Sequence, residues 1–129
     1  MKIEDLIQEM DIQDIDGFLI GQAEDAKRAT GVSVFLAPEG AASGVDVRGG
    51  GPASRETELL KPRADAQVIH AVVLSGGSAF GLNAAGGVMK SLREREIGFE
   101  TGYAKVPLVC QSCLFDLGLV DSYAYPDEE

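Results

Sequence analysis

Residues 68–92 read VIHAVVLSGGSAFGLNAAGGVMKSL and contain the pattern that decides the fold. The apolar run 68–74 predicts a strand in the middle of a sheet, because strands covered on both faces are apolar almost throughout. The small residues Ser75, Gly76, Gly77 and Ser78 predict a turn. Apolar side chains at helical spacing then predict a helix from about Phe80 to Leu92. A strand, a glycine turn and a helix form the unit on which α/β proteins commonly bind ligands.

The turn fits none of the well-known glycine-rich motifs. It is not G-x-S-x-G, because one residue too many separates Ser78 from Gly81, and it lacks the Lys-Ser/Thr pair of a Walker loop. It is not G-x-G-x-x-G either. Two interpretations stay open: Ser75 and Ser78 cap the helix, or free backbone N–H groups bind an anion, a carboxylate or a developing oxyanion.

Composition limits the class of protein. The chain has 129 residues, 45% of them hydrophobic, which suits one domain spanning residues 1–129. The formal net charge of −10 argues against binding to nucleic acid or to an anionic membrane, since both need clustered basic residues. No apolar stretch approaches the length of a membrane span, and the acidic N-terminus does not resemble a signal peptide. A cytoplasmic location is the expectation.

The remaining sequence predicts a mixed α/β or α+β domain. Residues 1–16 predict a short amphipathic helix. A short strand is expected at 18–20, and an antiparallel hairpin from strands 31–37 and 41–47 around a turn at Pro38 and Gly40. The glycine-rich residues 48–57, which include Arg48 and Arg55, predict a loop. The adjacent Gly86 and Gly87 predict tight packing of the helix against a sheet or another helix, and Gly98 is expected to end it. Residues 97–103 and 106–117 predict extended segments.

No catalytic set can be assembled from the side chains of this chain. A serine or cysteine nucleophile needs a base, and the single histidine, His70, lies in the predicted buried strand. The acidic residues are scattered without the spacing of a carboxylate pair or a metal site. Cys110 and Cys113 could form a redox pair or half of a zinc site, but their extended apolar surroundings favour reduced thiols in the core. No metal or other cofactor is expected.

Several blocks of the sequence, taken together, resemble one enzyme family. Residues 45–50 read VDVRGG and residues 74–82 read LSGGSAFGL, with further matching blocks from 31 to 117. In this order they resemble the N-terminal part of the DmpA-like, or L-aminopeptidase/D-esterase, family of self-processing amidohydrolases. The resemblance covers nearly all of the chain from Ile15 onward.

The resemblance implies a four-layer α/β/β/α sandwich similar to N-terminal-nucleophile hydrolases. It implies self-cleavage that frees an N-terminal serine or threonine, which attacks small peptides, amides and esters without a metal. The family's cleavage segment, similar to G-N-V-G-x-G-T-G, does not occur in these 129 residues. The chain is therefore expected to be a partial domain that lacks the nucleophile, needs the missing C-terminal part as its partner, and belongs to a homo-oligomer.

Only the turn can be compared residue by residue with the family. Gly76, Gly77, Ser78 and Phe80 match the motif that lines the substrate pocket, and some relatives have a tyrosine where Phe80 stands. Phe80 cannot donate a hydrogen bond to an oxyanion. We expect the 129 residues alone to be inactive and either unstable or self-associating, because sheet faces are left uncovered. The alternatives are a small-anion-binding module and a degenerate structural module without catalysis.

Overall fold

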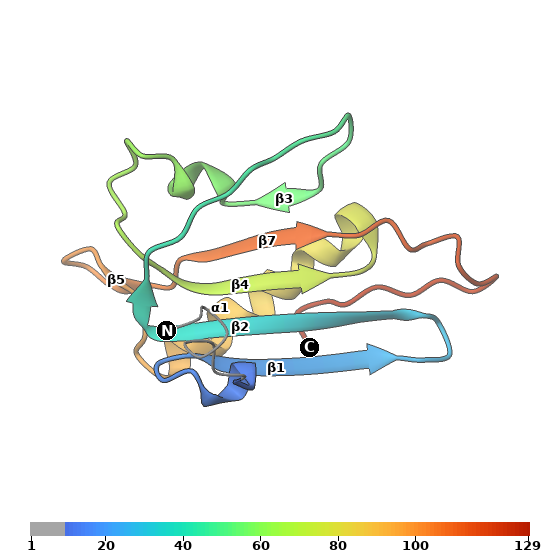
Figure 1. The fold of residues 1–129 in the computed structure, drawn as a ribbon, viewed down its shortest axis with the longest axis horizontal. Helices are drawn as coiled ribbons and strands as arrows, with labels where there is room; N and C mark the ends of the chain where they lie inside the picture. The colour runs from blue at the N-terminus through green and yellow to red at the C-terminus, as the bar shows by residue number, and fades with distance from the viewer. Residues whose placement is uncertain (1–9) are drawn as a thin grey trace, which may run out of the picture.

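A five-stranded mixed sheet forms the centre of the molecule (Figure 1). The computed structural model describes residues 10–129. The sheet has the order β1-β2-β4-β7-β3, and a separate two-stranded ribbon pairs β5 with β6. The strands are β1 (Leu19–Asp25), β2 (Thr30–Ala41), β3 (Ser54–Arg55), β4 (Ile69–Ser75), β5 (Phe99–Glu100), β6 (Lys105–Val106) and β7 (Val109–Cys113). The helices are the 3-10 turns η2 (Ile12–Asp14), η3 (Thr57–Leu60) and η4 (Ser78–Asn83), and the α-helix α1 (Ala84–Glu94).

The expected mixed α/β class is confirmed, and β4 is the central strand as predicted. It pairs antiparallel with β2 and parallel with β7. The predicted N-terminal helix falls largely on residues outside the described part, and the 3-10 turn η2 is the first described element. Among the described residues, no helix is long and apolar enough to cross a membrane.

The predicted hairpin between residues 31–37 and 41–47 is wrong. The observed hairpin joins β1 to β2, and its turn is stabilised by Asp25, whose carboxylate accepts the backbone N–H groups of Lys27 and Arg28. Strand β2 continues through Pro38 and Gly40 because a register shift there absorbs them as a bulge; Gly40 takes φ +83°. Proline and glycine are tolerated in sheets at such irregularities. Residues 42–48 form no strand.

The helical segment begins as a 3-10 turn and ends two residues after the predicted Leu92, but Gly98 does not terminate it. Residues of η4 precede α1, which ends at Glu94 rather than at Gly98. After the helix, Glu96 takes a left-handed conformation with φ +57°, and the Ile97 N–H donates to the carbonyl of Leu92. This is the usual way in which a helix terminates, except that a glutamate occupies the position that normally favours glycine.

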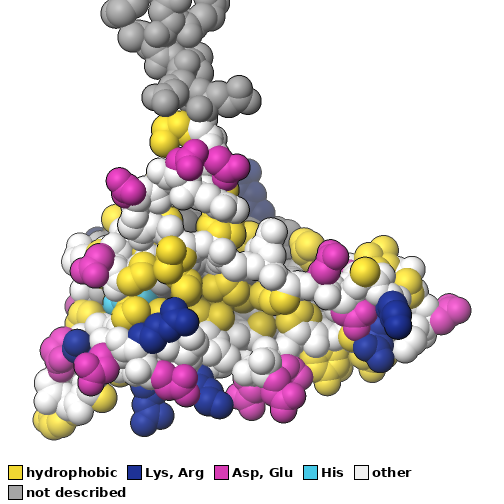
Figure 2. Space-filling model, turned by 90° about the horizontal axis from the view of Figure 1, so that it is seen from below, with side chains coloured by type: hydrophobic (Ala, Val, Ile, Leu, Met, Phe, Trp, Pro, Cys, Tyr) yellow, Lys and Arg dark blue, Asp and Glu magenta, His cyan; other side chains and the backbone are white. Residues whose placement is uncertain are grey.

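Helix α1 covers only one face of the sheet. The core cluster consists of Ala71, Val73, Ala84, Ala85, Leu92 and Val109, so it lies between α1 and strands β4 and β7. Val73 is fully buried, whereas its neighbour Leu74 is 45% exposed because successive side chains of a strand point to opposite faces. In the view of Figure 2, hydrophobic side chains gather in a band across the molecule with acidic groups around its outline. Within residues 10–129, no α-helix covers the opposite face of the sheet, which carries Leu74.

Candidate functional site

The glycine turn between β4 and η4 is held in a left-handed conformation. Gly77 has φ +87° and Ser78 has φ +53°, and the second value is unusual for a residue with a side chain. Each backbone N–H of the turn already has an acceptor. The Gly76 N–H donates to the Gly31 carbonyl at 2.9 Å, and the Ser78 N–H donates to the Leu114 carbonyl at 2.8 Å. The turn therefore presents neither of these groups as a free donor for an anion.

Asp116 is the acceptor for the third N–H of the turn. Its Oδ1 accepts the backbone N–H of Gly77 at 2.7 Å, and its Oδ2 accepts the Thr30 hydroxyl at 2.8 Å. Both residues are half-buried. Hydrogen bonds to an ionised acceptor are stronger than those between neutral groups. One carboxylate thus joins the start of β2, the glycine turn and the segment that follows β7.

Gln111 fastens the other side of the turn. It lies on β7 and its side chain is 2% exposed. Its Nε2 donates to the Ser75 hydroxyl at 2.9 Å and to the Gly81 carbonyl at 2.6 Å, while its Oε1 accepts the Ala85 N–H at 3.2 Å. The amide therefore satisfies an unpaired N–H at the start of α1, a function that a capping side chain would otherwise fill.

The predicted helix caps are wrong for both serines. Ser75 donates to the Gly81 carbonyl at 3.3 Å and lies 3.1 Å from the sulfur of Cys113, and neither η4 nor α1 has a side-chain cap at its N-terminus. Gly77 takes the position before η4, and the Gln111 amide binds the start of α1 instead. Tertiary contacts have replaced local capping here.

The four residues predicted to bind substrate lie on one short turn but differ in accessibility. Gly76 and Gly77 are buried, Ser78 is half-buried and Phe80 is 52% exposed. The Phe80 ring stacks on Tyr125, with centroids 5.0 Å apart and planes 20° from parallel. The backbone of Gly77 also contacts Tyr125. The most exposed member of the predicted set is therefore the aromatic ring of Phe80, beside the half-buried Ser78.

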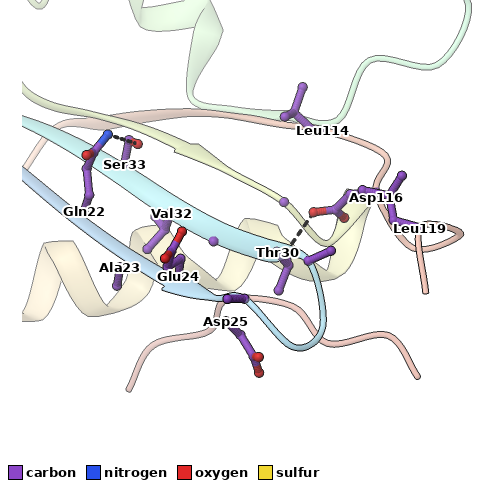
Figure 3. A pocket seen from close by; sticks show the side chains of 14 residues that line it. Gln22, Ala23, Glu24, Asp25, Thr30, Val32, Ser33, Leu114, Asp116 and Leu119 are labelled. Carbon is purple, nitrogen blue, oxygen red and sulfur yellow. Dashed lines mark hydrogen bonds between the residues drawn. The ribbon is translucent and has the colours of Figure 1, made fainter. Parts of the chain in front are cut away.

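A cavity of about 730 Å³ opens beside the turn (Figure 3). Its walls come from the end of the β1–β2 hairpin and from the segment after β7. Of the four predicted residues only Gly76 lines it, next to Asp116 and Thr30. Asp25 lies at its outer wall, where hydrogen bonds from Arg28 lower the pKa of the Asp25 carboxyl below its ordinary value. The cavity lining includes the acidic residues Glu24, Asp25 and Asp116 and does not include Phe80.

Two arginines of the glycine-rich loop have different surroundings. Arg55 reaches the carbonyl of Leu82 at 3.4 Å and the sulfur of Met89 at 3.3 Å, so it fastens β3 to the helical segment behind the turn. Arg48 pairs with Asp46 at 2.6 Å on the surface. We therefore assign Arg55 a part in supporting the turn.

His70 and Cys110 are buried, as expected, whereas Cys113 is half-buried. His70 is buried, its Nδ1 accepts the Leu108 N–H at 3.2 Å, and burial lowers the pKa of the His70 imidazole. Cys110 and Cys113 are free thiols, and burial raises the pKa of both. Among the described residues, no group of three or more His, Cys, Asp or Glu side chains could hold a metal ion.

Sequence reasoning missed the three side chains that hold the turn, which are Asp116, Thr30 and Gln111. In the sequence, Asp116 is one of several acidic residues without a recognisable spacing, and Thr30 lies in a polar stretch with no motif around it. One signal for Gln111 was available in the sequence: it is a polar residue between the apolar stretches 106–110 and 113–115. A buried amide is expected to have a structural partner.

Comparison with known proteins agrees with the resemblance. The sequence profile of Peptidase family S58 matches residues 10–124. A protein of Mycobacterium leprae (strain TN) named an uncharacterized aminopeptidase is 41% identical over 126 residues, covering 92% of this chain and 35% of the relative. A second uncharacterized aminopeptidase, from Mycobacterium tuberculosis (strain ATCC 25618 / H37Rv), is 40% identical over 114 residues, which cover 82% of this chain and 33% of the relative.

A third relative is named for a different activity. The 6-aminohexanoate-oligomer endohydrolase of Kocuria sp. (strain KY2) is 34% identical over 115 residues, covering 89% of this chain and 30% of the relative. The chain thus spans about a third of the length of these relatives. With a profile that matches 10–124 and relatives this similar, the chain belongs to Peptidase family S58, as its DmpA-like blocks predicted.

Proposed function

We propose that this chain is the N-terminal part of a self-processing aminopeptidase or amidohydrolase that acts on N-terminal residues of small peptides, amides or esters. The observation that carries the proposal is the family's LSGGSAFGL block, which stands at the end of the central strand in a chain of Peptidase family S58. The names of two relatives, an aminopeptidase and a 6-aminohexanoate-oligomer endohydrolase, both denote hydrolysis of amide bonds.

In this proposal, the nucleophile comes from sequence outside these 129 residues. Self-cleavage frees an N-terminal serine or threonine. The hydroxyl of this residue adds to the substrate carbonyl carbon, and the amine leaves with a proton. Water then hydrolyses the resulting ester. The contribution of this chain is a rigid wall, made of Gly76, Gly77, Ser78 and Phe80, against which the substrate is oriented. The N–H groups of Gly76, Gly77 and Ser78 are already bonded internally, so the oxyanion donors also come from elsewhere.

The proposal extends to architecture and partners. The 1–129 segment would form part of a four-layer α/β/β/α sandwich, in which a second sheet covers the face that carries Leu74. The exposure of Leu74 on the central strand supports this arrangement, because an apolar central-strand residue is normally covered. We further propose that the remaining C-terminal part of the precursor supplies that cover and that the assembled enzyme is a homo-oligomer. The cytoplasmic location expected from composition stays a prediction.

Hydrolysis assays test whether the nucleophile is absent from these 129 residues. We expect the purified 129-residue chain to release no product from aminoacyl p-nitroanilides above the rate without protein. Turnover that persists through repeated purification would contradict the proposal, since these residues would then contain their own nucleophile. The nucleotide sequence beyond the codon for Glu129 gives an independent test, because an in-frame segment similar to G-N-V-G-x-G-T-G is expected there.

Titration with phosphate tests the alternative of a small-anion site. Since Gly31, Asp116 and Leu114 already accept the three N–H groups of the turn, we expect no heat of binding in calorimetry. An anion would also have to approach the Asp116 carboxylate. A tight phosphate site at the turn would favour the binding-module alternative over the peptidase.

A further inference from the structure

The segment 120–129 lies over the predicted substrate wall and is held there by side chains. Tyr123 and Tyr125 both stack on Phe80, with ring centroids 6.4 Å and 5.0 Å away and planes 14° and 20° from parallel. Parallel stacks at such distances are favourable aromatic arrangements. Figure 1 shows the segment returning past the turn as an extended stretch without helix or strand.

The same segment explains the two adjacent glycines of α1. A methyl group added at Gly87 would lie 2.7 Å from the carbonyl oxygen of Glu128, and one added at Gly86 would lie 3.4 Å from its carboxylate. The glycines had predicted packing of the helix against a sheet or another helix; their observed contact is this irregular segment. The small residues of α1 therefore face a segment that has no regular secondary structure.

No backbone hydrogen bond joins residues 120–129 to another part of the described chain. The hydrogen bond within the segment runs from the Glu129 N–H to the Asp127 side chain. Both tyrosines stay exposed on their outer surfaces, with Tyr125 at 40% and Tyr123 at 54%. Segments with few buried contacts and no backbone bonding open at low free energy. The stack can therefore separate without disturbing the sheet.

We propose that the Phe80 ring and the Gly77 backbone form a binding site for an aromatic side chain, which Tyr125 occupies as an intramolecular substitute. The ligand class is a small amide or peptide whose N-terminal residue is aromatic. This inference rests on the proposed function, because that function makes the turn a wall of the substrate pocket. Phe80 offers an aromatic face without a hydroxyl, so recognition at this point depends on stacking.

The proposal predicts competition between Tyr125 and an added ligand. When an internal group occupies a site part of the time, the apparent affinity for a ligand falls to the intrinsic affinity multiplied by the fraction of molecules whose site is free, and removal of the occupant restores the full affinity. From the usual strength of an aromatic pair, the Tyr125→Ala variant should bind L-phenylalaninamide about three to ten times more tightly than the parent chain. L-alaninamide should gain nothing.

The experiment is an NMR titration of the 129-residue chain with these two amides. Tyr125→Phe keeps the stacked ring and should match the parent. Tyr103→Ala is the matched control, because Tyr103 is fully exposed and stacks on no ring among the described residues. Equal or weaker binding of L-phenylalaninamide by a folded Tyr125→Ala variant would overturn the proposal. An equal gain for L-alaninamide would also overturn it, since the site would not select aromatic groups.

A measurement on the unmodified chain covers the case in which Tyr125→Ala does not fold. As L-phenylalaninamide is added, the Tyr125 ring signals should move toward those of an unstructured tyrosine while the Tyr103 signals stay in place. Binding of L-phenylalaninamide without any change in the Tyr125 ring signals would refute the proposal that the ligand ring replaces the Tyr125 ring on Phe80. These readouts need no turnover, so failure of the aromatic site and failure of the hydrolase proposal are separate results.

Discussion

Replacing Asp116 by alanine tests whether one carboxylate holds the glycine turn. The substitution removes the acceptor of the Gly77 N–H at 2.7 Å and of the Thr30 hydroxyl at 2.8 Å. A hydrogen bond to a charged group contributes about 1.5–3 kcal/mol, and partial exposure of this site favours the lower end. We therefore expect Asp116→Ala to lower the free energy of unfolding by about 2–3 kcal/mol. Asp116→Asn keeps an acceptor for Gly77 and should lose only about 1 kcal/mol.

Urea unfolding at one fixed protein concentration measures these losses. Asp121→Ala is the matched control, because it removes an exposed carboxylate a few residues away and should change the free energy of unfolding by less than about 0.5 kcal/mol. A double-mutant cycle with Thr30→Val isolates the contact between the two side chains, for which we expect a coupling of about 1 kcal/mol. Hydrogen exchange at the Gly77 amide gives a local readout, since its protection should fall in Asp116→Ala.

Two results would refute this account of the turn. The first is a loss in Asp116→Ala no greater than in Asp121→Ala, which would mean that the carboxylate is replaceable by water. The second is a coupling near zero in the Thr30 cycle, which would mean that the two ends of the contact act independently. Unchanged exchange at Gly77 in a destabilised variant would assign the loss to some other part of the molecule.

Three further predictions concern the interior and the uncovered surfaces. Gln111→Leu leaves the Ala85 N–H and the Gly81 carbonyl without their partner, so urea unfolding should show a loss of about 2–4 kcal/mol, against little change for the exposed Gln67→Leu. Because burial lowers the pKa of His70 in the folded state, the unfolded chain binds more protons just below pH 6.5. Stability should therefore fall as the pH drops through that window, and a His70→Gln variant should lack this part of the fall when unfolding is compared at pH 7.5 and 5.5. Self-association should appear in sedimentation velocity as a species that grows with concentration, and Leu19→Lys on the exposed edge strand β1 should reduce it; a monomer with a sharp melt would contradict the expectation.

The central part of the fold was predictable because one stretch carries its own signals. The apolar run 68–74 has the length and composition of a strand buried on both sides, and β4 is the central strand of the sheet. The glycine turn and the helical spacing after it were also correctly placed in order. The local pattern therefore predicted the strand and its central place in the sheet, but not the 45% exposure of Leu74 on the face that α1 does not cover.

The hairpin could not be predicted because its signals conflict locally. Pro38 and Gly40 are the strongest turn residues of the region, yet β2 passes through them as a bulge. The real turn uses Asp25, whose carboxylate bonds two backbone N–H groups, a weaker sequence signal than proline and glycine together. The choice is decided by pairing of β1 and β4 on either side of β2, and that pairing joins residues far apart in sequence.

The site follows the same division between local and distant contacts. The turn itself was visible in the sequence, whereas Asp116 and Gln111, which hold it, are separated from Gly77 by more than thirty residues. An amino-acid pattern cannot indicate which of several acids meets a given N–H. Once that contact is known, the interpretation of the glycine turn changes: its N–H groups fix its own shape, and its most exposed residue is Phe80. Under the proposed function, the N–H groups of Gly76, Gly77 and Ser78 are not the oxyanion donors because they are already bonded, and the exposed Phe80 ring is the surface of the turn that a ligand can stack on.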